Sequence, residues 1–512
     1  MDKRKSIINI CVSISFKIVI LVVTLLVRRF LIKYIGNEIN GLNSLYLSIV
    51  GFLSVAELGV GSAITFCMYK PIIENDVEKV AGLYCLFKKL YLIIGIIILI
   101  AGLALMPFLP YFAKDYLEIN VNLYLTFGLM LISIVLSYCF SAKSSLITAY
   151  KDNYIVTTIT SLGTIMQCIL QIVVLIFTKS YVWYLVCRII AILFQWILTE
   201  IYARKDHSDI INLHVKIDPN TKKYVTRSIK AMFMHKIGDI LVNTADSVII
   251  SIFIGVVLLG KYSNYVTIVS SMMGLITLFF TPLTAIIGHM SAKGDVEAEK
   301  KYCNFFHTFN FIIGCIFFLG YYAVIDDVVA ICFDKNLELG RDVVIVITIN
   351  YFIQFMRQSI NLFRDATGTF YYDRYKPLIE GTINIILSVI FVNIFGIVGV
   401  IVATIITNIF ICHIVEPYVL YVHAFDDNPK KYYLRNYAYI FLFLITLFAF
   451  TFIRIDFDNV WISFIVNGVL SVMIAIFPCI VAFIFSKDFR FYFNKILLKF
   501  KSKFFKRNVI DN

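Results

Sequence analysis

One glycine-containing phrase occurs twice in this chain and decides its fold. It reads YIGNEINGLNSLY at residues 34–46 and FIGVVLLGKYSNY at residues 253–265. Both copies contain the pattern I-G-x4-G-x4-Y, and each residue of the second copy lies 219 positions after its counterpart, as Gly255 does after Gly36. A constant offset of nearly half the chain indicates an internal duplication.

The same register continues beyond the phrase. The run Asp-Val-Glu at 76–78 corresponds to the same run at 295–297. We interpret each copy as the end of one helix, a tight turn, a second helix and a polar loop, because glycine adopts positive φ in turns without steric cost. On this interpretation both glycines of the phrase belong to the turn.

The composition requires a membrane. Of the 512 residues 60% are hydrophobic and 15% are charged, and the mean hydropathy is +0.85, whereas a soluble domain carries about 25% charged residues. A bilayer core needs roughly 20 apolar residues per helix. About fourteen segments meet this need, at 11–33, 42–66, 90–113, 122–146, 156–178, 181–203, 233–257, 264–290, 306–333, 344–368, 377–395, 397–423, 436–454 and 461–485.

The predicted fold class is an all-α polytopic membrane protein with two parallel six-helix repeats, a MATE-like arrangement, and a C-terminal helix pair. Parallel repeats enclose a central site in transporters that work by alternating access. The predicted divisions are an N-terminal lobe (1–210), a cytoplasmic inter-lobe loop (211–232), a C-terminal lobe (233–425), two additional spans (426–486) and a basic amphipathic tail (487–512). The tail is expected to lie on the anionic inner surface of the membrane or to dock a partner.

The basic residues set the predicted orientation. With both termini inside, 32 of the 46 Lys and Arg fall on inner segments and seven on outer ones. Such an excess is typical of cytoplasmic loops. It also explains the net charge of +13 without a nucleic-acid partner.

Ionisable side chains inside spans are costly and mark candidate sites. Arg28, Arg29, Arg364 and Glu416 lie near span ends, where long side chains can snorkel to the interface. The basic residues predict a cationic cavity for a phosphate-bearing substrate, because guanidinium groups hold phosphate oxygens bidentately; they are Lys17, Arg28, Arg29, Arg188 and Arg357. A second set could couple transport to Na+ or H+, or pair with neighbouring cations; it comprises Glu57, Asp239, Asn243 and Asp246.

Several motifs resemble one family of exporters. They are RRFL-x4-GNE-x2-GL from Arg28, AELGVGSAI from Ala56, DRYKPLIEGTIN from Asp373 and FGIVGV from Phe395. The chain is similar along its length to the polysaccharide repeat-unit (Wzx-type) flippases of the multidrug/oligosaccharidyl-lipid/polysaccharide (MOP) superfamily. The resemblance implies a bacterial inner-membrane protein that moves an undecaprenyl-diphosphate-linked oligosaccharide to the outer leaflet for surface polysaccharide biosynthesis. It also implies coupling to an ion gradient or to the membrane potential.

Two other functions stay open on the sequence alone. A cation-coupled drug antiporter would fit the acidic face at 239–246, but the surplus of basic residues inside spans opposes it. A membrane glycan polymerase would need sizeable outer loops, and those predicted here are short. No metal site, cofactor or catalytic motif is predicted, so the protein is not expected to be an enzyme. The expected partners are the lipid-linked glycan, the membrane, and glycosyltransferases or a polymerase of the same pathway.

Overall fold

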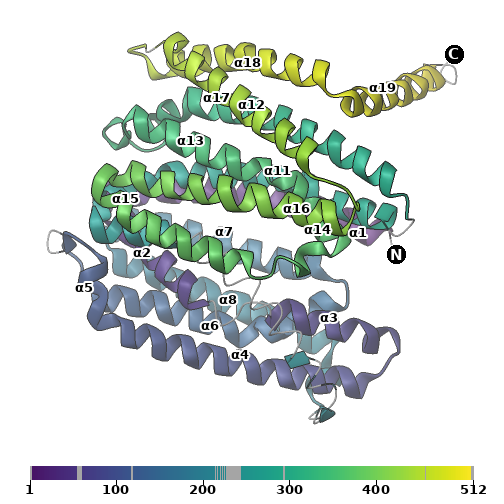
Figure 1. Ribbon diagram of the computed structural model, residues 1–512. Helices are drawn as coiled ribbons and strands as arrows, with labels where there is room; N and C mark the ends of the chain where they lie inside the picture. The colour runs from purple at the N-terminus through teal and green to yellow at the C-terminus, as the bar shows by residue number, and fades with distance from the viewer. Residues whose placement is uncertain are drawn as a thin grey trace. The chain divides into compact units, whose positions relative to one another are not determined.

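Helices account for nearly all of the fold (Figure 1). The computed structural model describes residues 3–54, 60–116, 119–213, 244–291, 294–455 and 457–508, with scattered positions from 215 to 226. The first-half helices are α1 Lys3–Ile35, α2 Asn37–Leu53, α3 Val60–Ile73, α4 Val77–Leu105, α5 Leu109–Phe112, α6 Leu123–Ala149, α7 Asn153–Thr178, α8 Tyr181–Asp206 and α9 Ser208–Ile211. The helix Thr244–Phe253 follows, and then α11 Val256–Ser291, α12 Val296–Cys332, α13 Arg341–Met356, α14 Gln358–Thr367, α15 Lys376–Thr407, α16 His413–His423, α17 Lys430–Ile453, α18 Val460–Phe485 and α19 Lys487–Asn508.

Length and hydropathy make most of these helices membrane spans. Among the described residues, nine helical segments are long and apolar enough to cross a bilayer. Their outward faces carry large hydrophobic side chains, as lipid-facing helices require; Phe448 and Phe452, for example, are 66% and 75% exposed. The prediction of an all-α polytopic membrane protein is therefore confirmed.

Two compact units divide the chain. Unit 1 comprises residues 1–267 and 377–400, and unit 2 comprises residues 268–376 and 401–512. In unit 1, α4, α6, α8 and α7 pack in succession, and α7 also packs on α1. In unit 2, α12 packs along α18 and α13. These units do not follow the predicted lobe boundaries, which stay a prediction.

Local structure repeats together with the sequence. Gly36 and Gly255 precede α2 and α11 with φ of 116° and 135°. Asp76 and Asp295 have nearly the same backbone angles, φ −84° and −85°, and each carboxylate caps the next helix by accepting a backbone N–H three residues later. The duplication is therefore present in the backbone as well as in the sequence, because a capped turn at equivalent positions needs both the residue type and the local geometry.

The second glycine of the phrase has a different role from the one predicted. Gly41 and Gly260 lie inside α2 and α11, not in the turns. A Cβ on Gly41 would lie 1.9 Å from the carbonyl oxygen of Val256, and one on Gly260 would lie 2.5 Å from that of Asn37. The two copies of the phrase thus cross each other within unit 1 at their equivalent glycines. The backbones of α2 and α11 can approach this closely because glycine has no side chain.

One predicted span differs from the structure, two are separated as predicted, and one is described only in part. The segment 42–66 is not one helix, because α2 ends at Leu53 and α3 begins at Val60. The spans 377–395 and 397–423 are separated at Gly396, which has φ 60°, as the predicted turn there requires. The span 233–257 is described only from residue 244. The basic tail is helical and forms α19. Its location at the membrane surface stays a prediction.

Candidate functional site

A cavity of 420 Å³ lies in unit 1, lined by side chains from α1, α2, α7, α8, the helix Thr244–Phe253 and the first part of α11. Its wall contains Arg28 from α1 and Arg188 from α8. Of the described residues that line it, none is Asp or Glu. Among its described residues the wall therefore carries two formal positive charges and no carboxylate.

Hydroxyl groups hold the guanidinium of Arg28. Its Nη1 donates to the hydroxyl of Thr267, and its Nη2 donates to the hydroxyls of Ser263 and, at 3.4 Å, Ser44. Its Nε has no hydrogen-bond partner among the described residues. Neutral hydroxyls orient a guanidinium but leave its charge in place, so Arg28 can still attract an anion.

Amide side chains line the cavity beside the arginines. Gln167 donates to Gln171 at 3.4 Å, and Gln171 donates to the carbonyl oxygen of Tyr184 at 3.2 Å, which fixes both along α7. Asn43 of α2 accepts from the hydroxyl of Tyr181 at 3.1 Å. These amides present neutral donors and acceptors to the cavity, as a ligand with many hydroxyl groups requires.

The sequence interpretation missed these amides because it searched spans for charge. Gln167 and Gln171 stand four residues apart in an apolar run, so they share one helix face. That spacing of uncharged polar residues was the available signal. The aromatic residues Tyr184 and Tyr262, which also line the cavity, had no comparable signal among 31 tyrosines.

The structure brings together two of the five predicted basic residues. Arg28 and Arg188 share the cavity wall. Lys17 and Arg29 are exposed on α1 and are not among the residues that line the cavity. Of the predicted coupling residues, Asp246 lies half-buried in the helix Thr244–Phe253. The other three fall outside the described residues; they are Glu57, Asp239 and Asn243.

Arg357 belongs to a separate ion cluster in unit 2, at the junction of α13 and α14. Its Nη2 donates to Oε1 of Glu416 at 2.6 Å and its Nε donates to Oε2 at 3.1 Å, a bidentate pair. The Nη1 donates to Asn408 at 2.6 Å, in a π-helical turn at Asn408–Cys412. Its charge is therefore largely matched by a carboxylate, unlike that of Arg28.

The same cluster corrects the expectation that Arg364 and Glu416 snorkel to the interface. They are 6% and 1% exposed. Lys376, which lies between the predicted spans 344–368 and 377–395, is 7% exposed and donates to Glu416 at 2.6 Å. Arg364 binds Asp373 at 2.5 Å. The cluster thus joins three cations, two of them buried and Arg357 half-buried, to two buried carboxylates, and such groups remain inside only because each has a partner.

The chain was compared with known proteins by sequence and by structure, and only solved structures are similar to it. No protein-family model matches the chain, and no curated protein matches it by sequence. Among solved structures, lipid II flippase MurJ in an inward closed conformation is similar with a TM-score of 0.60 and 16% identity, over 92% of this chain and 98% of that one.

Two MATE transporters are also similar. An inward-facing multidrug resistance MATE family transporter of the MOP superfamily gives a TM-score of 0.55 at 12% identity, over 80% of this chain and 97% of its own. The bent form of the Vibrio cholerae MATE transporter VcmN gives 0.52 at 12% identity, over 85% and 99%. The chain therefore shares its fold with MurJ and with these MATE transporters. The predicted fold class is confirmed, and the Wzx-type subfamily stays a prediction.

Proposed function

We propose that this protein moves an undecaprenyl-diphosphate-linked oligosaccharide from the inner to the outer leaflet of the bacterial cytoplasmic membrane by alternating access. The observation that carries the proposal is the cavity wall in which Arg28 and Arg188 face no carboxylate among the described lining residues. A diphosphate supplies the missing negative charge, and guanidinium groups hold its oxygens in bidentate pairs.

The rest of the wall fits a glycan. The amides of Asn43, Gln167 and Gln171 offer donors and acceptors for sugar hydroxyls, and the rings of Tyr184 and Tyr262 offer faces for stacking. The fold shared with a lipid II flippase supports a lipid-linked cargo. An organic cation would meet two arginines instead of the acidic wall that it requires, so the drug-antiporter alternative is disfavoured.

A vesicle assay tests the proposal. The purified full-length protein is placed in liposomes with undecaprenyl-diphosphate-linked oligosaccharide on one side, and transfer to the other leaflet is followed with a glycan-cleaving enzyme confined to one compartment. Arg28→Gln and Arg188→Gln should each slow transfer roughly tenfold to a hundredfold, the effect of losing one charge-assisted hydrogen bond. Lys33→Gln is the matched control, because Lys33 lies on the same helix α1 but is not among the residues that line the cavity.

Two results would count against the proposal. If the wild-type protein does not speed transfer, and cells without it do not accumulate the lipid-linked glycan inside, the function is wrong. If transfer occurs but Arg28→Gln and Arg188→Gln match Lys33→Gln, the site is wrong. Arg29→Gln separates the structure-based site from the sequence-based one, because Arg29 lies outside the cavity lining.

Coupling to Na+ or H+ is a second part of the proposal. Asp246 is the predicted coupling residue that the structure describes, half-buried in a helix of unit 1 next to the cavity residue Ser247. The remaining predicted residues are Glu57, Asp239 and Asn243. Asp246→Asn should abolish the acceleration of transfer by an imposed Na+ or pH gradient while leaving gradient-free transfer in place. Equal acceleration in the variant would remove Asp246 from this role.

A further inference from the structure

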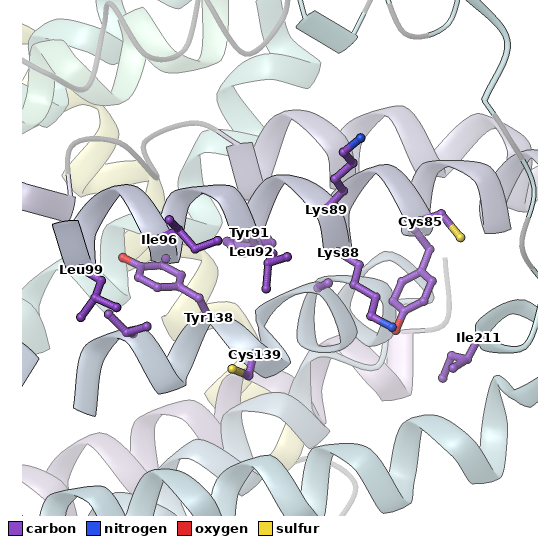
Figure 2. A pocket seen from close by; sticks show the side chains of 14 residues that line it. Cys85, Lys88, Lys89, Tyr91, Leu92, Ile96, Leu99, Tyr138, Cys139 and Ile211 are labelled. Carbon is purple, nitrogen blue, oxygen red and sulfur yellow. The ribbon is translucent and has the colours of Figure 1, made fainter. Parts of the chain in front are cut away.

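A second cavity lies in unit 1 between α4 and α6. Its volume is 540 Å³, and Ile211 at the end of α9 closes one end. Figure 2 shows Ile96, Leu99 and Tyr138 at one end of this groove and Cys85, Lys88 and Ile211 at the other. The groove is separate from the arginine-lined cavity, with which it shares no lining residue.

The walls of the groove are apolar and open outward. Leu92 and Ile96 on α4 are 64% and 48% exposed, and they stand four residues apart on one helix face. From Cys85 to Leu99 the lining residues extend along about 21 Å of helix, at roughly 1.5 Å per residue. That length exceeds the depth of one bilayer leaflet, about 15 Å of hydrocarbon. The groove can therefore accommodate an acyl chain along its whole length.

One end of the groove is positively charged. Lys88 and Lys89 both line it, both are exposed, and neither forms an ion pair with any residue that the structure describes. The carboxylate of Glu200 acts electrostatically on the lining residue Tyr84, but it is paired with Lys143 and Arg204. The two lysines therefore have their charges available for an external anion.

We infer that this groove binds an anionic phospholipid of the bilayer, with an acyl chain along Leu92, Ile96 and Leu99 and the phosphate at Lys88 and Lys89. The charge distribution of the sequence assigns this end of α4 to the cytoplasmic side, where anionic lipids give the membrane its negative surface. A zwitterionic headgroup would place a cation beside two lysines, so phosphatidylglycerol fits better than phosphatidylcholine. The bound lipid would also touch Ile211 and so brace the segment after α8 against α4.

Native mass spectrometry of the purified full-length protein tests this inference. The protein is titrated with phosphatidylglycerol and with phosphatidylcholine of identical acyl chains. The wild type should bind phosphatidylglycerol more tightly, and Lys88→Gln/Lys89→Gln should weaken that binding roughly thirtyfold, as expected for two interfacial lysines. Lys88→Arg/Lys89→Arg should retain it, because the charge is kept.

Two further variants decide the location. Lys430→Gln/Lys431→Gln removes an equally exposed lysine pair at the start of α17 that lines no cavity described here, and it should bind like the wild type. Ile96→Trp should fill the groove and weaken binding of both lipids. The inference is overturned if Lys88→Gln/Lys89→Gln binds phosphatidylglycerol as the wild type does, or if Lys430→Gln/Lys431→Gln loses as much. It is also overturned if the wild type does not distinguish the two lipids. A polyprenyl phosphate that the purified wild type carries and Ile96→Trp does not would overturn it as well.

Discussion

Replacing Gly41 by alanine should force α2 away from α11. The new Cβ would lie 1.9 Å from the carbonyl oxygen of Val256, whereas ordinary contact begins at 3.4 Å, so the backbones must separate by 1.5 Å. Because both atoms belong to helices, no side-chain rotation relieves the clash. The expected cost is at the upper end of overpacking, about 3 kcal/mol. The higher helix propensity of alanine returns about 1 kcal/mol, which leaves a net loss of about 2 kcal/mol in unfolding free energy.

The equivalent change in the second copy should be coupled to the first. Gly260→Ala brings a Cβ within 2.5 Å of the carbonyl oxygen of Asn37, at the same crossing. Once one Cβ has separated the helices, the other meets less resistance. The double variant should therefore lose clearly less than the sum of the single losses. Gly288→Ala, later in α11, is the matched control. Its new Cβ would lie 3.6 Å from the nearest atom outside the helix, the carbonyl oxygen of Ala366, which is an ordinary contact.

Reversible unfolding in mixed detergent micelles measures these differences, and vesicle transfer provides a second assay. Gly288→Ala should be as stable as the wild type or slightly more stable, and its effect should add to that of Gly41→Ala. Two outcomes would refute the reasoning. One is a Gly41→Ala protein as stable as Gly288→Ala. The other is a double variant whose loss equals the sum of the two single losses, since independent sites do not share a crossing.

Three further predictions concern buried and perturbed charges. Glu416→Gln should lower the unfolding free energy by about 3 to 5 kcal/mol, because it removes the carboxylate that holds three cations, and chemical denaturation measures the loss. Asp326→Asn should destabilise unit 2 by roughly 3 kcal/mol, because Asp326 is the 3.2 Å partner of the buried Arg454, and in Asp326→Asn/Arg454→Met the loss should be smaller. Burial holds the pKa of His207 below 6.5 despite three nearby carboxylates. The fold therefore favours the neutral imidazole. This contribution to stability is complete above pH 6.5 and falls as the pH drops toward the lowered pKa. His207→Gln should therefore lose less stability than the wild type between pH 6.5 and 5, and equal slopes would contradict the assignment.

The sequence predicted the fold well because the bilayer simplifies the problem. Backbone groups in lipid must be paired within helices, so an apolar run of sufficient length is already an element. The constant offset then related the halves, and it placed Asp76 and Asp295, a residue type that favours helix N-caps, at equivalent positions. The role of Gly41 and Gly260 was missed for a physical reason. A glycine needed for a turn and one needed for close helix approach look the same in sequence, and they differ only in what lies opposite.

The candidate site was predicted in part. Arg28 and Arg188 were recognised as costly charges inside spans, and the structure places both in one cavity. Arg357 satisfied the same criterion, yet its guanidinium is paired with a carboxylate 59 positions later in the sequence. Spacing on one helix could not reveal that pair, because it joins different helices through tertiary packing. The amides of α7 were missed because burying a neutral amide costs less free energy than burying a charge. A glutamine inside an apolar span is therefore a weaker indication of a site than an arginine.

Arg28 and Arg357 lie in contrasting environments, so we expect one to bind an anion and the other to stabilise the fold. In unit 2 three cations share two carboxylates, so the cluster is close to balanced without a ligand, and its cost of burial is met inside the protein. In unit 1 the partners of Arg28 are hydroxyls, which leave most of the desolvation cost of the charge unmet. A fold that retains this imbalance lowers its free energy when an anion enters the cavity and raises it again when the anion leaves. Under the proposed function, the anion that enters is the diphosphate of the lipid-linked substrate. Glu416→Gln would therefore be expected to damage folding first, and Arg28→Gln to damage transfer first.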